Sequence, residues 1–202
     1  METRGASAVI GNTLEQQIIG LYDRDINAAF SINQIAKKLK KKYPYINKKV
    51  NQLIKENILV KTVIGHTHLC SLNLQNERKT VLLTINEIAK KESLLNKDDW
   101  KNKCRKISRC IKDTSVKTVL CSDNKLFFVM RELKDQEMIK KELKLKNKMR
   151  FLTPEQFKKL LLKDKTIIED HTILHAYEGY YQTIKEIRGE LQLRYSPLIP
   201  LK

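Results

Sequence analysis

Three carboxamide side chains at helical spacing are the first residues of this chain that could read another molecule. Asn47, Asn51 and Gln52 lie in the segment INKKVNQLIKEN, whose apolar residues recur at i, i+4, i+7 and i+8. A carboxamide offers a donor and an acceptor side by side, which is the pairing that an adenine edge presents in the major groove. The spacing therefore predicts a helix with a polar outer face made of Tyr45, Asn47, Lys48, Asn51, Gln52 and Lys55.

Lysines surround this segment and offer contacts to phosphate. Lys48, Lys49 and Lys55 lie within it. Cations at the end of a helix often complement its dipole, but five lysines within six positions exceed that need, so we expect phosphate contacts that give sequence-independent affinity. These five are Lys37, Lys38, Lys40, Lys41 and Lys42.

A second group of polar residues falls in a predicted β-hairpin. Lys61, His66 and His68 lie in ILVKTVIGHTHLCSL, which contains two β-branched runs around Gly65-His66. We expect these side chains to touch an adjacent groove or the DNA backbone. The alternative is that the histidines, like the polar helix face, are ordinary solvated residues of a domain that binds protein.

Metal or nucleophilic chemistry has weaker signals. His171 and His175 beside Asp170 would share one face of a helix and could hold a metal, but buried histidines packed near tyrosines are the favoured interpretation. The cysteines show no C-x-x-C pair or zinc-type spacing, so we expect reduced, buried thiols. We expect no cofactor, no metal and no small-molecule substrate. The cysteines are Cys70, Cys104, Cys110 and Cys121.

The overall charge indicates a polyanionic partner. Among 202 residues, 40 lysines and arginines outnumber 23 acidic residues, for a net charge of +17. A membrane surface is the competing partner, but the chain shows no basic amphipathic helix with aromatic anchors, no long apolar span and no signal-peptide core. We therefore expect a cytoplasmic protein associated with the nucleoid.

The first half reads as helix, short strand, two helices and a hairpin. Thr13 and Gln16 form a capping pair before the first helix, and Asn33 is the expected cap of the second. Pro44 suits the first turn of the third helix, predicted over Tyr43 to Asn57. The hairpin strands follow at Ile58 to Ile64 and Thr67 to Leu72, and then a fourth helix from about Lys79 to Leu95.

The second half is expected to be a small α/β domain behind a linker at Asn96 to Lys103. A helix at Trp100 to Lys112 precedes two strands, Val116 to Leu120 and Leu126 to Met130. A basic helix or loop follows at Glu137 to Lys148. Thr153 and Pro154 signal another helix, and the last runs from Tyr177 to Leu191. The fold class is thus α+β, with domains at 10–95 and 104–195.

This order of elements resembles a winged helix, in which the third helix enters the major groove. FSINQIAKKL, YPYINKKVNQLIKENILV and IGHTHLCSLNLQNE look like the winged helices of archaeal transcription regulators that carry a nucleotidyltransferase-fold domain. TVLCSDNKLFFVMREL, LTPEQFKKLL and IIEDHTILHAYEGYY resemble a shortened form of that second domain. Active members of the family have Gly-Ser and an Asp-x-Asp pair that holds metal, whereas here Cys121-Ser122 and a single Asp123 followed by Asn124 stand in their place.

The resemblance implies a non-enzymatic protein that binds double-stranded DNA, as a transcription regulator or a nucleoid-associated protein. The alternative is a nucleotidyltransferase-type enzyme or a toxin-antitoxin component that acts on RNA or protein. The two apolar strands of the second half suggest a sheet covered on both faces. With Tyr177, Tyr180 and Tyr181 as interface residues, this predicts a homodimer. A monomer is the alternative, and the lysines between Lys140 and Lys148 would then be what this half contributes.

Overall fold

The computed structural model describes residues 13–23 and 25–195, and the chain divides into two compact units. The first comprises the chain up to Asn86 together with the segment from Leu191 onward, and the second runs from Glu87 to Glu190. The division falls inside α5 (Glu77–Leu95), not at the linker expected at residues 96–103. That stretch is mostly the start of α6 (Asp98–Cys110), because only Asn96 and Lys97 separate the two helices.

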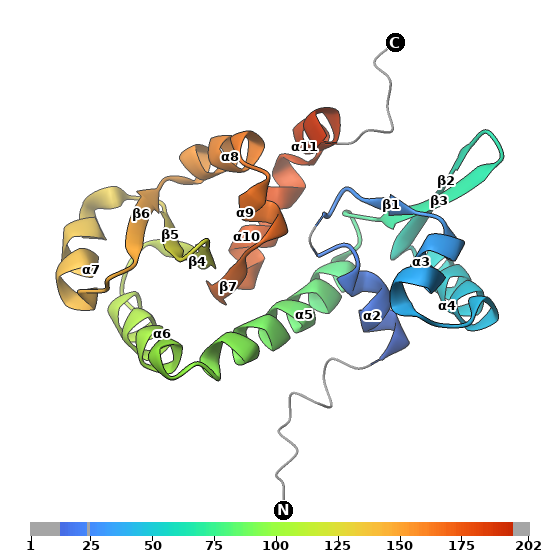
Figure 1. Cartoon of the computed structure of the whole chain (residues 1–202). Coiled ribbons are helices and arrows are strands. Elements are labelled where there is room, and N and C mark those ends of the chain that lie inside the picture. The colour runs from blue at the N-terminus through green and yellow to red at the C-terminus, as the bar shows by residue number, and fades with distance from the viewer. Residues whose placement is uncertain (1–12, 24, 196–202) are drawn as a thin grey trace, which may run out of the picture. The chain divides into compact units, whose positions relative to one another are not determined.

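The described part of unit 1 starts with α2, α3 and α4, and capping boxes begin the first two of these helices (Figure 1). Thr13 and Gln16 form the predicted capping box of α2 (Leu14–Gly20). The cap of α3 (Ile32–Leu39) is Ser31, which forms a capping box with Gln34, so the assignment to Asn33 is wrong. Ser31 is the cap because its partner lies three residues later, where the box requires it.

The third helix, α4 (Tyr43–Lys55), has Pro44 in its first turn, as predicted. It packs an apolar stripe of Ile46, Val50 and Leu53 into the core, and all three are fully buried. After the helix, Asn57 adopts a positive φ of 58°, and the Ile58 N–H donates to the Leu53 carbonyl. Asparagine tolerates this left-handed conformation well, so it ends the helix and turns the chain toward β2.

The three-stranded sheet of unit 1 has the order β1-β3-β2 and is antiparallel throughout. β1 (Ala29–Phe30) is short, whereas β2 (Leu59–Ile64) and β3 (Thr67–Leu72) form the predicted hairpin. Gly65 has a φ of 58°, the left-handed region that the two-residue turn requires. Near its base the hairpin is fixed by the buried Tyr22 hydroxyl, which donates to the Cys70 carbonyl at 2.9 Å.

Unit 2 contains a four-stranded mixed sheet of order β6-β5-β4-β7. β4 (Val116–Ser122) and β5 (Lys125–Met130) form the predicted hairpin, and β7 (Thr172–His175) pairs antiparallel with β4. β6 (Lys148–Leu152) runs parallel to β5. The helices of unit 2 are α6, α7 (Gln136–Leu143), α8 (Pro154–Lys163), α9 (Thr166–Glu169) and α10 (Tyr177–Glu186), and η1 (Leu133–Asp135) is a 3-10 turn. The last helix, α11 (Arg188–Tyr195), begins in unit 2 and continues into unit 1 from Leu191.

Both faces of this sheet are covered by helices of the same chain. Leu126, Phe128 and Met130 of β5 pack with α6 and α7 in one apolar cluster. Phe127 and Val129 alternate to the opposite face, where α8 packs on β5 and α10 on β4. The prediction of two-sided burial is confirmed. The dimer prediction, however, used a partner chain to help cover this sheet, and helices of the same chain already do so.

The tyrosines expected at a dimer interface lie mostly inside unit 2. Tyr180 and Tyr181 are buried, with ring centroids 5.4 Å apart, and Tyr180 also contacts Phe157 of α8. These rings therefore serve the fold of one chain. Dimerisation remains a prediction, and the tyrosines no longer support it.

Several short elements of unit 2 are not predicted by the sequence pattern. β6 falls between a lysine-rich run and a strong helix start, and α9 is a single turn. The final helix is broken at Ile187 into α10 and α11. Each of these features depends on packing against neighbours more than on a local pattern.

The outer edge of β7 is closed by two side chains of α5. The Glu87 carboxylate accepts from the Ile173 N–H at 3.0 Å, and the Lys91 ammonium donates to the Leu174 carbonyl at 2.5 Å. Such bonds satisfy backbone groups that an edge strand would otherwise leave open. No helix among the described residues is both long and apolar enough to cross a lipid bilayer.

Gly179 provides a test of the packing between α10 and β4. A Cβ atom there would lie 2.5 Å from the Lys117 carbonyl oxygen, a distance that forces the helix away from the sheet. Gly179→Ala should therefore lower the stability of unit 2 by about 1–3 kcal/mol, despite the better helix propensity of alanine. Trp100, the single tryptophan, reports the urea unfolding of this unit by fluorescence.

Gly189→Ala is the matched control, because nothing lies within 4 Å of its added Cβ. This change should leave the free energy of unfolding unchanged or raise it by up to about 1 kcal/mol, so the urea midpoint should not fall. Equal midpoints for both variants would contradict the close approach of α10 to β4.

Candidate nucleic-acid interface

The polar side of α4 that faces the hairpin carries two linked carboxamides. Asn51 Nδ2 donates to Asn47 Oδ1 and also to the Asn47 carbonyl, both at 2.9 Å. The Asn47 amide group and the Asn51 Oδ1 make no bond to any other described residue. Together the two side chains present one donor and one acceptor.

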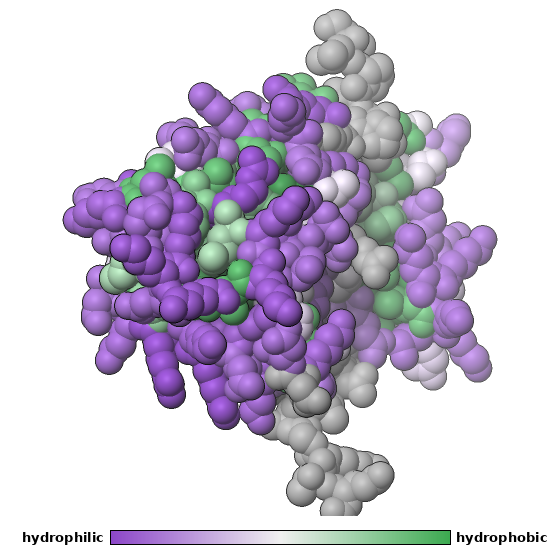
Figure 2. All heavy atoms as spheres, turned by 60° about the vertical axis from the view of Figure 1, so that its left-hand side comes forward, coloured by the Kyte–Doolittle hydropathy of each residue, from purple (hydrophilic) through white to green (hydrophobic). Residues whose placement is uncertain are grey.

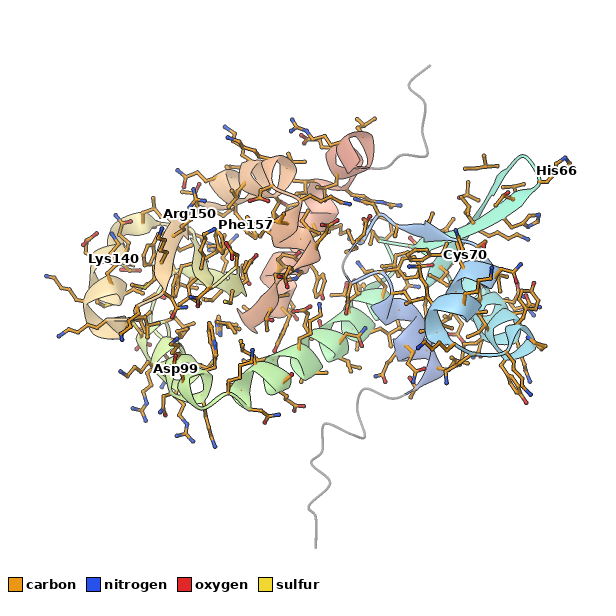
Figure 3. All side chains as sticks on the ribbon, in the orientation of Figure 1. His66, Cys70, Asp99, Lys140, Arg150 and Phe157 are labelled. Carbon is orange, nitrogen blue, oxygen red and sulfur yellow. The ribbon has the colours of Figure 1, made fainter. Side chains whose placement is uncertain are left out.

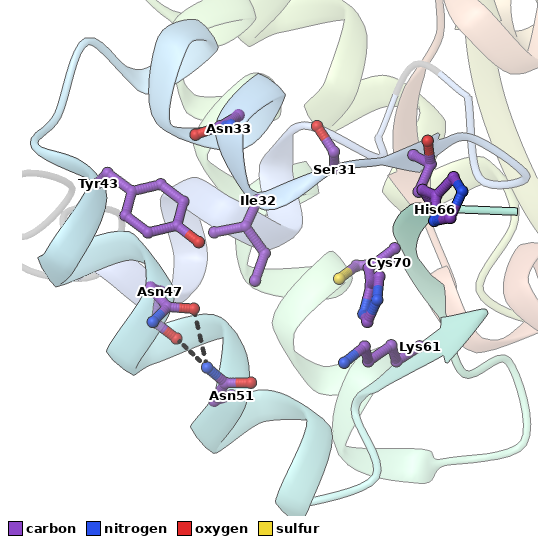
Figure 4. Close-up of a pocket in the computed structure, with 11 residues that line it drawn as sticks. Ser31, Ile32, Asn33, Tyr43, Asn47, Asn51, Lys61, His66 and Cys70 are labelled. Carbon is purple, nitrogen blue, oxygen red and sulfur yellow. Dashed lines mark hydrogen bonds between the residues drawn. The ribbon is translucent and has the colours of Figure 1, made fainter. Parts of the chain in front are cut away.

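These two residues line an open groove of about 490 Å³ between α3, α4 and the hairpin (Figure 4). The groove brings together five of the predicted site residues, namely Asn47, Asn51, Lys61, His66 and His68. It also contains residues that the sequence did not single out, namely Ser31, Ile32, Asn33, Tyr43, Thr67 and Cys70.

Tyr43 lines the groove and was not predicted as a site residue, although the sequence contains the signal for it. It lies four residues before Asn47, so it shares a helix face with Asn47 and Asn51. Its side chain is exposed. The sequence indicated Tyr45 instead, which is also exposed but lies at i, i+4 and i+7 spacing with Lys49 and Gln52.

Gln52 and Lys49 belong to a different network on the other flank of α4. Gln52 Nε2 donates to Glu56 at 2.8 Å, while its oxygen accepts from Lys49 at 3.1 Å. Arg78 pairs with Glu56 at 2.7 Å and with Glu15 at 3.4 Å. Lys49 also lies 3.8 Å from Glu15. These bonds occupy the Gln52 carboxamide and partly neutralise Lys49, so the predicted polar face divides into two.

Lys48 and Lys55 lie between these two flanks, one on each half of the helix. Both are exposed, and neither lines the groove or forms an ion pair within the described part of the chain. Their side chains are therefore available to an anion on the outward side of α4.

The five lysines expected to contact phosphate cluster at the end of α3. Lys37 and Lys38 form its last turn, Lys40 caps it with a φ of 53°, and Lys41 and Lys42 occupy the turn before α4. All five are exposed, and only Lys38 has a described partner, the Phe30 ring at 5.2 Å. Two of them fall in the helix, so the dipole accounts for less than half of the cluster.

The hairpin projects exposed side chains of mixed character. Every residue from Val60 to His68 is exposed, including Lys61, His66 and His68. Figure 3 labels His66 at the tip of the hairpin. Val63 and Ile64 are 60% and 46% exposed, an unusual solvent exposure for β-branched residues. An extended ribbon of this kind can lie along a nucleic-acid backbone or in a groove.

The cysteines show no sign of reactive chemistry. All four are free thiols, and three are buried as predicted, whereas Cys121 is only partly buried. Burial raises the pKa of Cys70, although Lys61 opposes the shift, and raises that of Cys121 to about 11. Burial together with Glu142 raises the pKa of Cys110 to about 12. Thiols with raised pKa values stay protonated at neutral pH and are poor nucleophiles.

The segment for which the sequence suggested a degenerate nucleotidyltransferase site has one carboxylate at a turn. Asp123 has a φ of 46° at the tip between β4 and β5, and it pairs with Lys125 at 2.8 Å, which lowers its pKa. Ser122 is buried. Among the described residues, no group of three or more His, Cys, Asp or Glu side chains is placed to hold a metal ion.

The helical metal pair suggested for His171 and His175 is wrong, because this segment is a strand. His171 directly precedes β7 and His175 ends it, and an extended chain separates Cα positions four residues apart by about 13 Å, too far for the two rings to share one ion. His171 is instead buried against Tyr180, with ring centroids 4.5 Å apart, and its Nδ1–H donates to the Ile168 carbonyl at 3.0 Å. The favoured interpretation, a packed histidine, is confirmed.

Comparison with protein-family models, curated proteins and solved structures finds no match to this chain. The assignment of this interface therefore depends on its own geometry.

His171 predicts an acid-sensitive unit 2. Burial lowers its pKa, and this outweighs the opposing effect of Glu87, whose carboxylate lies 3.9 Å from Nε2. The unfolded histidine takes up a proton near pH 6.5 while the folded one does not, so stability falls as the pH drops below that value. The measurement is the urea midpoint from Trp100 fluorescence at pH 7.5 and 5.5.

His171→Gln should reduce this pH dependence, even if it lowers stability at both pH values. His66→Gln, which changes an exposed histidine of unit 1, is the matched control and should leave the dependence as in the parent protein. The same pH dependence in His171→Gln as in the parent would show that another group carries the effect.

Proposed function

We propose that this chain binds double-stranded DNA through unit 1, as a winged-helix protein associated with the nucleoid. Three helices followed by a β-hairpin support this fold, with α4 as the recognition helix and β2-β3 as the wing. A helix with its side chains is about 10–12 Å wide, and the major groove of B-DNA is about 12 Å wide. The exposed side of α4 is thus of a size to enter the groove.

The observation that carries the proposal is the linked pair Asn47 and Asn51. Their mutual hydrogen bond leaves an N–H donor on Asn47 and an oxygen acceptor on Asn51. Adenine presents the complementary set in the major groove, an N7 acceptor beside an N6 donor. The bond also fixes both side chains before binding, which reduces the entropic cost of complex formation.

Lysines on three sides of this pair support backbone contacts. Lys48 and Lys55 point outward from α4, and the cluster from Lys37 to Lys42 lies at the start of the helix. Lys61 lines the groove from the hairpin. Phosphate contacts of this kind position a protein on a duplex without reading its sequence.

Within this proposal, the carboxamide pair favours a regulator that prefers certain sequences over a general coating protein. The alternative of a nucleotidyltransferase-type enzyme or a toxin-antitoxin component has less support. Its metal clamp needs two carboxylates, and Asp123 is turned to Lys125 at a hairpin tip.

Replacing Asn47 and Asn51 with alanine should weaken sequence preference more than total affinity. Removing the hydrogen bonds to one base costs about 1–3 kcal/mol on a preferred site and little on a random duplex. The measurement is gel shift with the best duplex selected from a random pool and with unselected duplexes. Equal reductions on both would favour a coating protein.

Gln52→Ala is the control for this pair, because its carboxamide is already bonded to Glu56 and Lys49. We expect this variant to keep both affinity and preference. A loss of preference equal to that of the Asn47 and Asn51 variant would contradict the division of α4 into two flanks.

Replacing Lys37, Lys41 and Lys42 with glutamine should lower affinity for all duplexes alike. The slope of log affinity against log salt from 50 to 200 mM should become shallower by about 0.9 for each phosphate that is no longer neutralised. Lys117→Gln, Lys163→Gln and Lys185→Gln together remove the same charge from exposed positions of unit 2 and serve as the control. An identical slope in both triple variants would assign the effect to net charge alone.

A further inference from the structure

Two lysine-rich segments that are distant in sequence meet on one side of unit 2. From Lys101 to Lys112 the chain has six cations and no acid, and from Lys140 to Arg150 it has six cations and one acid. The first segment includes most of α6, and the second includes the end of α7 and most of β6. Because α6 packs against α7, the two runs form one surface.

A groove of about 420 Å³ marks the place where they meet. It is lined by Asp99, Asn102, Lys103, Lys106, Lys144, Leu145 and Lys146. Lys103 is occupied, because it pairs with Asp99 at 2.5 Å and lies 4.8 Å from the centre of the Trp100 ring. Within the described chain, Lys106, Lys144 and Lys146 have no ion-pair partner. The groove therefore has one neutralised lysine and three available ones.

The outer side of α6 extends this positive groove into a row. Lys101, Arg105 and Arg109 are exposed and follow one another at spacings of four residues along α6, and the exposed Lys112 lies in the turn after the helix. Residues four apart are separated by about 6 Å along the axis of a helix, whereas neighbouring phosphates of one DNA strand are separated by about 3.4 Å along the DNA axis. Such a row can meet roughly every second phosphate of a backbone.

The apolar anchors that other anionic partners require are scarce on the described surface of unit 2. Met138 is the single exposed large hydrophobic residue among the described positions of unit 2. Figure 2 turns the side of unit 2 with α6 and α7 toward the viewer and shows long hydrophilic side chains over most of it. A membrane surface or an acidic peptide is usually bound with apolar insertion as well as charge.

We propose that this side of unit 2 is a second binding surface for the phosphodiester backbone of nucleic acid, independent of base sequence. Lys106, Lys144 and Lys146 hold phosphates in the groove, and the cations of α6 extend the surface. Asp99, labelled in Figure 3, neutralises Lys103 and marks the limit of the site. Since both units belong to one chain, binding by one raises the effective concentration of the other at the same nucleic acid.

The test uses the full chain with Lys106→Gln, Lys144→Gln and Lys146→Gln combined. On a random-sequence DNA duplex, the salt slope should become shallower by up to about 2.7, which is about 0.9 for each of three neutralised phosphates. At 150 mM salt, the affinity of this variant for the duplex should be about tenfold to a hundredfold lower than that of the parent protein. The control is the triple glutamine variant at Lys117, Lys163 and Lys185, and equal behaviour of the two would overturn the inference.

Folding of the glutamine variant is checked by Trp100 fluorescence. A second triple variant carries arginine at the same three positions. The arginine variant keeps the charge and should keep the parent affinity and slope. Loss of binding in the arginine variant as well would overturn a role based on charge. RNA of the same sequence, in duplex and in single-stranded form, shows which backbone this surface prefers. The inference is supported if the glutamine variant binds any of these nucleic acids more weakly than the control variant does.

Binding by unit 2 and binding by unit 1 can be tested separately, because each has its own triple variant. If the variant at Lys37, Lys41 and Lys42 loses affinity and the unit 2 variant matches its control, unit 1 alone binds DNA and the inference is wrong. If the unit 2 variant loses affinity and the unit 1 variant does not, the inference stands without the proposed function. A unit 2 variant that loses binding only to phosphatidylserine vesicles would overturn the inference in favour of a membrane surface.

Discussion

The burial of one apolar stripe of α4 determines what unit 1 can present to a partner. Ile46, Val50 and Leu53 are removed from water completely, and their burial contributes about 1.5–3 kcal/mol each. This burial fixes the rotation of the helix about its own axis. Asn47 and Asn51 must then face the groove beside the hairpin, while Gln52 must face Glu56. The candidate interface is therefore a consequence of the core.

Electrostatic repulsion is the opposing constraint on this chain. A net charge of +17 destabilises any compact arrangement, and surface ion pairs such as that of Arg78 with Glu56 recover only about 0–1 kcal/mol each. Most of the described cations are exposed, where water screens them, although Lys79 is buried. A bound polyanion would relieve this repulsion, so the unliganded protein is less stable than its apolar cores alone would make it.

Unit 2 uses its polar residues differently from unit 1. Glu87 is buried, and it serves the backbone of β7 together with Lys91 from the next turn of α5. His171 is buried beside it without a partner for Nε2 among the described residues. These polar groups of α5 close the edge of the sheet, whereas most cations of unit 2 are exposed. The interior is thus built for packing, and the surface is left to interact.

The sequence by itself determined the elements with strong local signals. The capping box at Thr13, Pro44 at the start of α4, the Gly65 turn and the apolar period of α4 all act within a few residues, so their hydrogen bonds and sterics can be deduced from the chain. Only tertiary structure decided that Gln52 is occupied by Glu56, that helices of the same chain cover both faces of the second sheet, and that His171 precedes a strand. It also decided that the lysines of α6 and those after α7 meet in one groove. These outcomes depend on interactions between residues far apart in sequence, which no local pattern specifies.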